Sequence, residues 1–404
     1  MELNQNQAKT LWEAGGFLIL RDLPEGSEFG IDGIVHIVKK FSGIKFLPPG
    51  IHLVSWSPPS STAGPSVIPI RRAILRDFAP KERYILDYVQ DHENVDVPAD
   101  ASTISDESLK TLDKELAPYP FQGVDAWKAL ISYLTPSVLS SVLGADGRVD
   151  GMMPVSGQDE DSLAKDMRDK LDEMKKKSEI QEAGYKTLKF ARFDLKRSWR
   201  EGAVGEEVTR FSRDKSWLLG HVIANQLHRE PRQLLAHLQL SFILLLHLSS
   251  YSCLIKYKHI LTLFCHSSSF LISPSTFLPP PINNPNASVG TEIKKFFREV
   301  INIVRTHLEA LPDGAFETEL PEMDVFFLDQ LESLRKNLGF AIWGTKTDQD
   351  VQWKESERQT LKQTWDRLRD SAWKRWEWDV DELGHRVEDK DLEEGEYAPV
   401  IVEM

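Results

Sequence analysis

The chain has 404 residues, more than one compact core usually supports, so its length favours two domains. Its composition, 41% hydrophobic and 27% charged, is ordinary for a globular protein and argues against a wholly disordered or fibrous chain. The formal net charge is -13, which disfavours dominant direct binding of nucleic acid, because such proteins usually present a basic face to phosphates. The two cysteines, Cys253 and Cys265, are not in a CxxC spacing, so neither a zinc site nor a disulfide framework is indicated and a reducing compartment fits.

Residues 1–155 carry short apolar runs separated by turns. The runs lie at 17–20 (FLIL), 44–47 (IKFL), 51–56 (IHLVSW) and 84–89 (YILDYV), and PEG and PPG sequences separate the first three. Short apolar runs between Gly and Pro signals predict strands of an antiparallel sheet or sandwich. We therefore expect a β-rich N-terminal domain over residues 1–155.

Helical spacing begins within this domain, and a charged stretch follows it. From residue 105, leucines at 109, 112 and 116 share one helical face, and a second apolar face runs from 127 to 134. Residues 156–200 are predicted to be a charged linker with a polar helix over 161–177. Within it, residues 188–194 (LKFARFD) partly alternate and are a candidate strand returning to the first domain's sheet.

Residues 201–380 are predicted to form an all-α domain. Apolar residues recur at helical spacing over 214–227, after Pro231, and over 292–311, 324–338 and 355–378, whereas the Ser- and Pro-rich stretch at 266–289 is expected to be a loop.

One apolar segment in this region is long enough to be considered as a membrane-spanning helix. Residues 238–255 contain no Asp, Glu, Lys or Arg and approach spanning length. They include Gln239, His247 and several serines and lack aromatic residues at both ends, so a buried core helix is favoured and no membrane association is expected.

The predicted last helix carries four tryptophans, and an acidic tail follows at 381–404. Core packing plus an interface is favoured for Trp365, Trp373, Trp376 and Trp378 over a platform that stacks RNA bases. The tail ends in YAPVIVEM, where an apolar β-branched triplet, Val400 to Val402, follows an acidic flank. Such a segment can add a strand to the sheet edge of a partner, or equally to its own domain.

No residue pattern in the sequence meets the spacing that catalysis requires. There is no GxSxG, HExxH, GxxxxGK[ST] or GxGxxG motif. The sequence DGRVDG at 146–151 lacks the ligands of a calcium loop, and Cys265 beside His266, with His259 nearby, is better explained as structural than as a thiol nucleophile. We therefore predict no catalytic, cofactor-binding or metal-binding residues.

Several longer motifs resemble the AAR-type cistron-splicing factor family. GSEFGID at 26–32, FSGIK at 41–45 and LPPGIH at 47–52 resemble that family's signature G-[TS]-E-F-G-I-D … F-x-G-[IV]-K-x-[IL]-P-P-G-[IV]-H. Similar matches follow in order at PYP (118–120) with WK (127–128), in the segments 234–242 and 261–265, and at the C-terminus. The signature residues here are Gly26, Glu28, Phe29, Gly30, Ile31, Asp32, Gly43, Pro48, Pro49, Gly50 and His52.

The resemblance implies an α+β fold: an N-terminal β-sandwich-like domain, an all-α C-terminal domain and an extended acidic tail. It implies a non-catalytic assembly factor in pre-mRNA splicing. Its partner would be the large scaffold protein of the U5 snRNP, bound at its RNase H-like and Jab/MPN domains, with the particle's helicase held off until maturation. The tail residues implied to bridge these two domains as an added strand are Tyr397, Ala398, Pro399, Val400, Ile401, Val402 and Glu403.

The resemblance also implies a cytoplasmic and a nuclear location and release by phosphorylation, for which Ser273, before Pro274, is a candidate in an expected exposed loop. Gly26, Gly30, Gly43 and Gly50 are expected to serve turns that need positive φ. Glu28, Phe29 and Asp32 either fix the fold or touch the partner. Two other functions stay open: an RNA-binding protein, and a hydrolase with a pocket between its domains.

Overall fold

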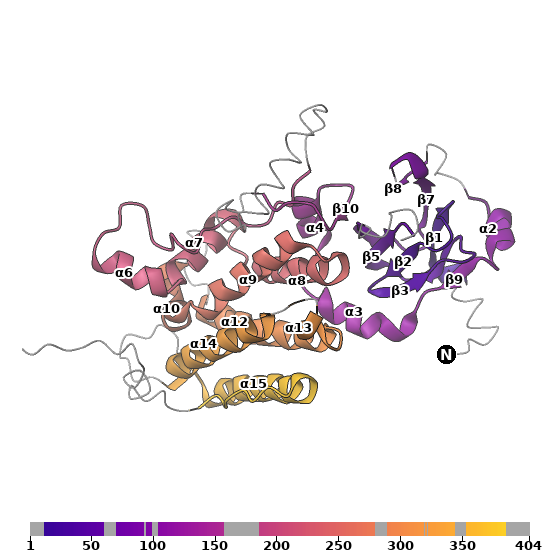
Figure 1. The fold of residues 1–404 in the computed structure, drawn as a ribbon. Helices are drawn as coiled ribbons and strands as arrows, with labels where there is room; N and C mark the ends of the chain where they lie inside the picture. The colour runs from indigo at the N-terminus through magenta and orange to yellow at the C-terminus, as the bar shows by residue number, and fades with distance from the viewer. Residues whose placement is uncertain are drawn as a thin grey trace, which may run out of the picture. The chain divides into compact units, whose positions relative to one another are not determined.

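The computed structural model describes residues 12–59, 70–92, 94–98, 104–156, 186–278, 289–318, 320, 322–343 and 353–384. The chain divides into two compact units: residues 1–190 with 236–257, and residues 191–235 with 258–404. The strands lie in the first unit and most helices in the second, so the predicted α+β class is confirmed (Figure 1). The predicted polar helix at 161–177 and the C-terminal tail from 385 onward lie outside the described residues.

The first unit contains two five-stranded sheets. In sheet A the order is β8 (Asn94–Asp96), β7 (Arg83–Val89), β1 (Gly16–Arg21), β4 (Gly43–Leu47) and β9 (Leu116–Pro118). In sheet B the order is β10 (Arg148–Asp150), β6 (Arg72–Phe78), β5 (Gly50–Ser57), β2 (Glu28–Ile31) and β3 (Ile34–Ile37). Sheet B is antiparallel as predicted, but sheet A is mixed, because β1 pairs with β7 and β4 with β9 in parallel. The long connections between these partners permit parallel pairing, which short apolar runs do not reveal.

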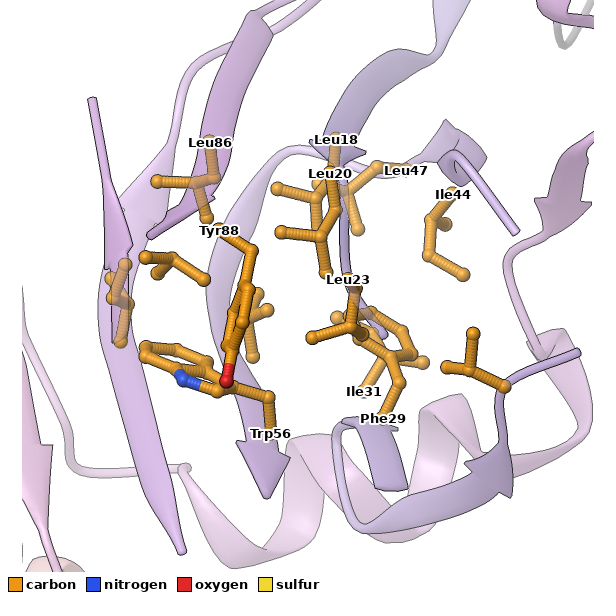
Figure 2. Close-up of a cluster of buried hydrophobic side chains, with 14 of the residues drawn as sticks. Leu18, Leu20, Leu23, Phe29, Ile31, Ile44, Leu47, Trp56, Leu86 and Tyr88 are labelled. Carbon is orange, nitrogen blue, oxygen red and sulfur yellow. The ribbon is translucent and has the colours of Figure 1, made fainter. Parts of the chain in front are cut away.

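The core of the first unit lies between the two sheets. Leu18 and Ile44 of sheet A meet Phe29, Ile31 and Trp56 of sheet B in one buried cluster (Figure 2). Alternate residues of each strand supply it, because successive side chains point to opposite faces of a sheet. This arrangement confirms the expected sandwich-like architecture.

Short helices complete the first unit. They are η1 (Gln90–His92), α2 (Asp106–Leu112), η2 (Phe121–Gly123), α3 (Val124–Leu130) and α4 (Pro136–Leu143). The leucines at 109, 112 and 116 do not share one helix as predicted: Leu109 of α2 packs under sheet A, whereas Leu116 opens β9. Residues 188–194 do not form a strand either, and Leu188 makes only an isolated bridge with Val155.

The apolar segment 238–255 belongs to two helices, α8 (Pro231–Leu248) and α9 (Tyr251–Cys265). Ser249, with φ of 53°, breaks the helix between them. The segment was predicted to be one core helix of the C-terminal domain, but residues 236–257 group with the N-terminal unit. One cause is Gln239, whose Oε1 accepts from Tyr133 N at 2.8 Å and whose Nε2 donates to Ser132 Oγ at 2.9 Å. None of the described helices is both long and apolar enough to cross a bilayer.

The second unit is helical, and each predicted helix is present. It contains α6 (Glu206–Arg213), α7 (Ser216–Gln226), α10 (Ser268–Ile272), α11 (Pro274–Phe277), α12 (Val289–Ala310), α13 (Ala315–Thr318), α14 (Met323–Trp343) and α15 (Glu355–Trp376). The stretch predicted to be a loop at 266–289 contains the two short helices α10 and α11, because Pro274 suits the first turn of a helix. Both helices pack against α7, so this part of the stretch belongs to the core.

Candidate functional site

Three signature residues, Asp32, Pro48 and His52, meet at the turn that joins β2 to β3. Asp32 and Gly33 form a two-residue turn and have φ of 51° and 83°. Positive φ at both positions is the geometry of a type I′ turn, which Asp-Gly sequences favour and which matches the twist of a hairpin. Asp32 N donates to Leu53 O at 2.9 Å, so the turn is also tied to β5. Sequence and local geometry therefore agree on a fixed turn here.

The Asp32 carboxylate is buried and receives three hydrogen bonds. Its Oδ1 accepts from Leu53 N at 3.0 Å, and its Oδ2 accepts from Tyr119 OH at 2.6 Å and lies 2.6 Å from His52 Nδ1. The side chains of His52 and Asp32 are only 4% and 3% exposed. A buried carboxylate is costly unless polar groups surround it, and here two of them come from β5 and the third from the segment after β9. The cluster therefore joins β2, β5 and the segment after β9.

His52 has an acceptor at each ring nitrogen. Its Nε2 lies 2.9 Å from Pro48 O, and its Nδ1 faces the carboxylate of Asp32. Each ring nitrogen therefore faces an oxygen, and the two contacts fix the orientation of the ring between β2 and the PPG turn. Burial raises the pKa of Tyr119, and the charge of Asp32 raises it further, so the phenol stays protonated and donates. This explains why the signature contains PPG before the histidine: Pro48 supplies the second acceptor.

This cluster does not have the geometry of a catalytic dyad. A general base needs a ring nitrogen that can reach a substrate proton, and Pro48 O occupies Nε2 of His52. The pair is also sealed from solvent. Asp32 therefore fixes the fold, which answers the question the sequence left open for it; Phe29 does the same, being 1% exposed in the core. Glu28 lies at the surface, where its carboxylate pairs with Arg71 at 3.3 Å.

At two signature glycines, the surrounding atoms leave no space for a side chain. Gly43 has φ of 133°, and a Cβ there would lie 2.0 Å from Leu18 O, because β1 and β4 approach closely. Gly30 was expected to need positive φ, and that was wrong: it sits inside β2, where a Cβ would lie 2.3 Å from Ser55 Oγ. At Gly30 the constraint is space rather than φ. Gly26 and Gly50 do have positive φ, as expected.

The other predicted site residues are not brought to this cluster. Tyr397 to Glu403 lie outside the described residues. Ser273 was expected in an exposed loop, but it is half-buried between α10 and α11, and Pro274 beside it is buried. Its N–H donates to Ser269 O at 2.9 Å, which ties it to α10.

The described residues form neither a reactive-cysteine site nor a metal-binding site. Cys253 and Cys265 are both buried, and burial raises the pKa of the Cys253 thiol to about 12. A protonated, inaccessible thiol is a poor nucleophile. No group of three His, Cys, Asp or Glu side chains in the described ranges is placed to hold a metal ion.

The tryptophan-rich helix α15 serves mainly the core. Trp365 is fully buried, and its Nε1 donates to Asp381 O at 2.9 Å. Trp376 and Trp378 pack around Phe316, with ring centroids 4.5 Å and 5.2 Å away. Trp373 is 61% exposed. One exposed ring does not form the run of aromatic surfaces on which successive bases stack.

Comparison with known protein families shows which family this chain belongs to. The AAR2 N-terminal domain matches residues 14–144, and the AAR2 C-terminal repeat region matches residues 190–381. The chain belongs to the AAR2 family. The two AAR2 matches include the buried cluster at Asp32 and the helices from α6 to α15, whereas residues 145–189 and the tail after 381 lie outside both.

Curated AAR2 relatives agree with this assignment. The chain is 24% identical to Protein AAR2 homolog of Pongo abelii over 318 residues, which are 75% of this chain and 82% of the relative. It is 23% identical to the Homo sapiens homolog over the same shares. The Caenorhabditis elegans homolog is 29% identical over 143 residues, 34% of this chain and 38% of the relative. The AAR2 likeness thus extends over both compact units.

Proposed function

We propose that this chain is a non-catalytic assembly factor of the U5 spliceosomal particle. It binds the particle's large scaffold protein at the RNase H-like and Jab/MPN domains and holds off the helicase until maturation. AAR2 family membership across both units is the observation that supports this role. The closed cluster at Asp32 is consistent with it, because these signature residues build a binding scaffold rather than a reactive pocket.

In this proposal the C-terminal segment joins the two scaffold domains. Val400 to Val402 favour an extended strand, and strand addition uses main-chain hydrogen bonds that do not depend on a preformed core. The ordering cost of the tail is offset only when the partner is present. We further propose that the complex forms in the cytoplasm and is resolved in the nucleus, with release linked to phosphorylation.

A pull-down tests the proposal. The RNase H-like and Jab/MPN fragments, each with a different tag, are mixed with the full chain, with a chain ending at Glu396, or with a V400P/V402P variant. A V400T/V402T variant is the matched control, because Thr keeps both N–H groups and a high strand propensity. We expect the full chain and the Thr control to join both fragments, and the other two to lose the bridge. If no version binds either fragment, the proposed function is refuted.

A further inference from the structure

Strand β3 borders sheet B, and its outer edge is not paired with any described strand (Figure 1). The hydrogen-bonding direction follows from the register with β2. Val38 N donates to Ser27 O at 2.8 Å, in the register that sets Ile37 opposite Glu28. Alternate residues of an antiparallel edge face the same way, so His36 and Ile34 bond β2, whereas the N–H and C=O groups of Val35 and Ile37 point outward.

The side chains of these two residues are unusually exposed for apolar groups. Val35 is 49% exposed and Ile37 60% exposed, and they share one face of the sheet. Gly30 lies opposite Val35, and Ser55 Oγ fills the space that a side chain at Gly30 would take. The edge thus offers two outward backbone pairs and an apolar surface on the same short strand. Edge strands that are not meant to pair usually carry charges or bulges at such positions.

The edge is preorganised. The turn that begins β3 is held by the buried carboxylate of Asp32, and Gly33 packs directly against the ring of His247. At the same end of the strand, Ile34 packs against Gly123. A fixed edge loses little conformational freedom when a strand is added, so more of the binding free energy is retained.

Two exposed lysines, Lys39 and Lys40, follow β3, and β3 itself contains no acidic residue. The acidic residue opposite Ile37, Glu28 of β2, pairs with Arg71 at 3.3 Å. Lys40 keeps 85% of its side chain exposed although its Nζ lies 3.3 Å from Glu115 Oε1. Opposite charges flanking an added strand would be attracted here, and like charges repelled.

These charges argue against a second copy of the chain as the occupant. Antiparallel self-pairing through Val35 and Ile37 would place His36 opposite His36 of the copy and Lys39 opposite Gly33, so Lys39 would gain no acidic partner. A four-residue strand also buries far less than the roughly 800 Å² per partner of a typical stable interface.

We propose that the outer edge of β3 is a docking site for an extended segment of a partner protein, which has apolar β-branched residues at alternate positions between acidic flanks. The segment adds as a sixth strand to sheet B, bonds the outward groups of Val35 and Ile37, and covers their side chains. This site accepts a strand and lies in the β domain. It is therefore independent of the proposed role of the C-terminal tail, which donates one.

The test measures fluorescence anisotropy of the full chain with a labelled peptide, Glu-Glu-Val-Thr-Val-Thr-Val-Glu-Glu. The control peptide has Lys at the four flanking positions. The key protein variant is I37P, because proline removes an outward N–H while the bonds to β2 come from neighbouring residues. I37T is its matched control. We expect the acidic peptide to bind at least about tenfold more tightly than the basic one. We expect I37P to lose about tenfold in affinity and I37T less than about threefold.

Hydrogen exchange keeps the test decisive if I37P misfolds. Binding should slow exchange at the amides of Val35 and Ile37, and a peptide N-methylated at its central valine should give no protection. Equal affinity for the two peptides, or no protection of β3, refutes the proposal. A dimer in light scattering that I37P abolishes would instead make a second copy the occupant. If a chain that ends at Gly384 binds the peptide about tenfold more tightly than the full chain does, the occupant of this edge is the C-terminal tail. Either result overturns the partner segment.

Discussion

Replacing Asp32 by Asn isolates the charge of the buried cluster. Asn has nearly the same shape and, like Asp, tolerates positive φ, so the turn with φ of 51° at this position is not disturbed. Oδ1 can still accept from Leu53 N. The new amide group, however, faces His52 Nδ1 and Tyr119 OH, which both contact the carboxylate of the parent chain. D32N therefore removes the charged acceptor oxygen that these two contacts share.

The expected loss of stability follows from the number of hydrogen bonds that D32N affects. A hydrogen bond to a charged group contributes about 1.5–3 kcal/mol, and D32N weakens two of them, from His52 and Tyr119. We expect D32N to destabilise the first unit by about 3–5 kcal/mol. Y119F is the matched milder change, because it deletes one donor and leaves Asp32 paired with His52 and Leu53. It should cost about 1–2 kcal/mol.

Hydrogen exchange is the appropriate assay, because a chain of two units need not unfold in one step. The amide of Leu53 donates to Asp32 Oδ1 and reports on the cluster directly. If D32N changes the opening free energy at Leu53 by less than about 0.5 kcal/mol yet abolishes binding to the scaffold fragments, Asp32 acts on the partner. The assignment of a structural role to this cluster would then be wrong.

Four further variants test other parts of the structure. G33A should cost about 2–3 kcal/mol in thermal unfolding, because φ is 83° and the new Cβ would lie 2.5 Å from Cε1 of His247; an unchanged melting temperature contradicts this. Burial, helped by the charge of Arg71, lowers the pKa of His247 to about 4, whereas the unfolded value is about 6.5. The unfolded state alone binds this proton between those values, so the stability is complete above pH 6.5 and is lost as the pH falls toward 4, by about 1.4 kcal/mol per pH unit. In urea titrations across that window, H247L should have a shallower slope than the parent chain by that amount, and parallel slopes would refute the assignment. W365A should cost about 3–5 kcal/mol and W373A less than about 0.5 kcal/mol, since the first ring is buried and the second is 61% exposed; similar denaturation midpoints for the two variants would contradict their placement.

The sequence by itself determined the element types well where local pattern and burial coincide. The runs at 17–20 and 51–56 are strands, and Pro231 begins a helix. The turn signal PEG lies between β1 and β2, and PPG lies where β4 gives way to β5, because turn chemistry and side-chain periodicity are local properties. The signature also marked the correct place in the chain. Its length and specificity were enough to indicate the family.

Tertiary structure alone decided what those residues do. Tyr119 lies 87 residues from Asp32 in sequence, and no local pattern indicates that its hydroxyl meets that carboxylate. The parallel pairing of β1 with β7 and the grouping of residues 236–257 with the β-rich unit depend in the same way on contacts between distant segments. The partial burial of Ser273 follows from packing of α10 and α11 on α7, which the Ser- and Pro-rich composition of this stretch does not reveal. Spacing along a chain specifies which face a side chain is on, but only the folded chain brings a partner to that face.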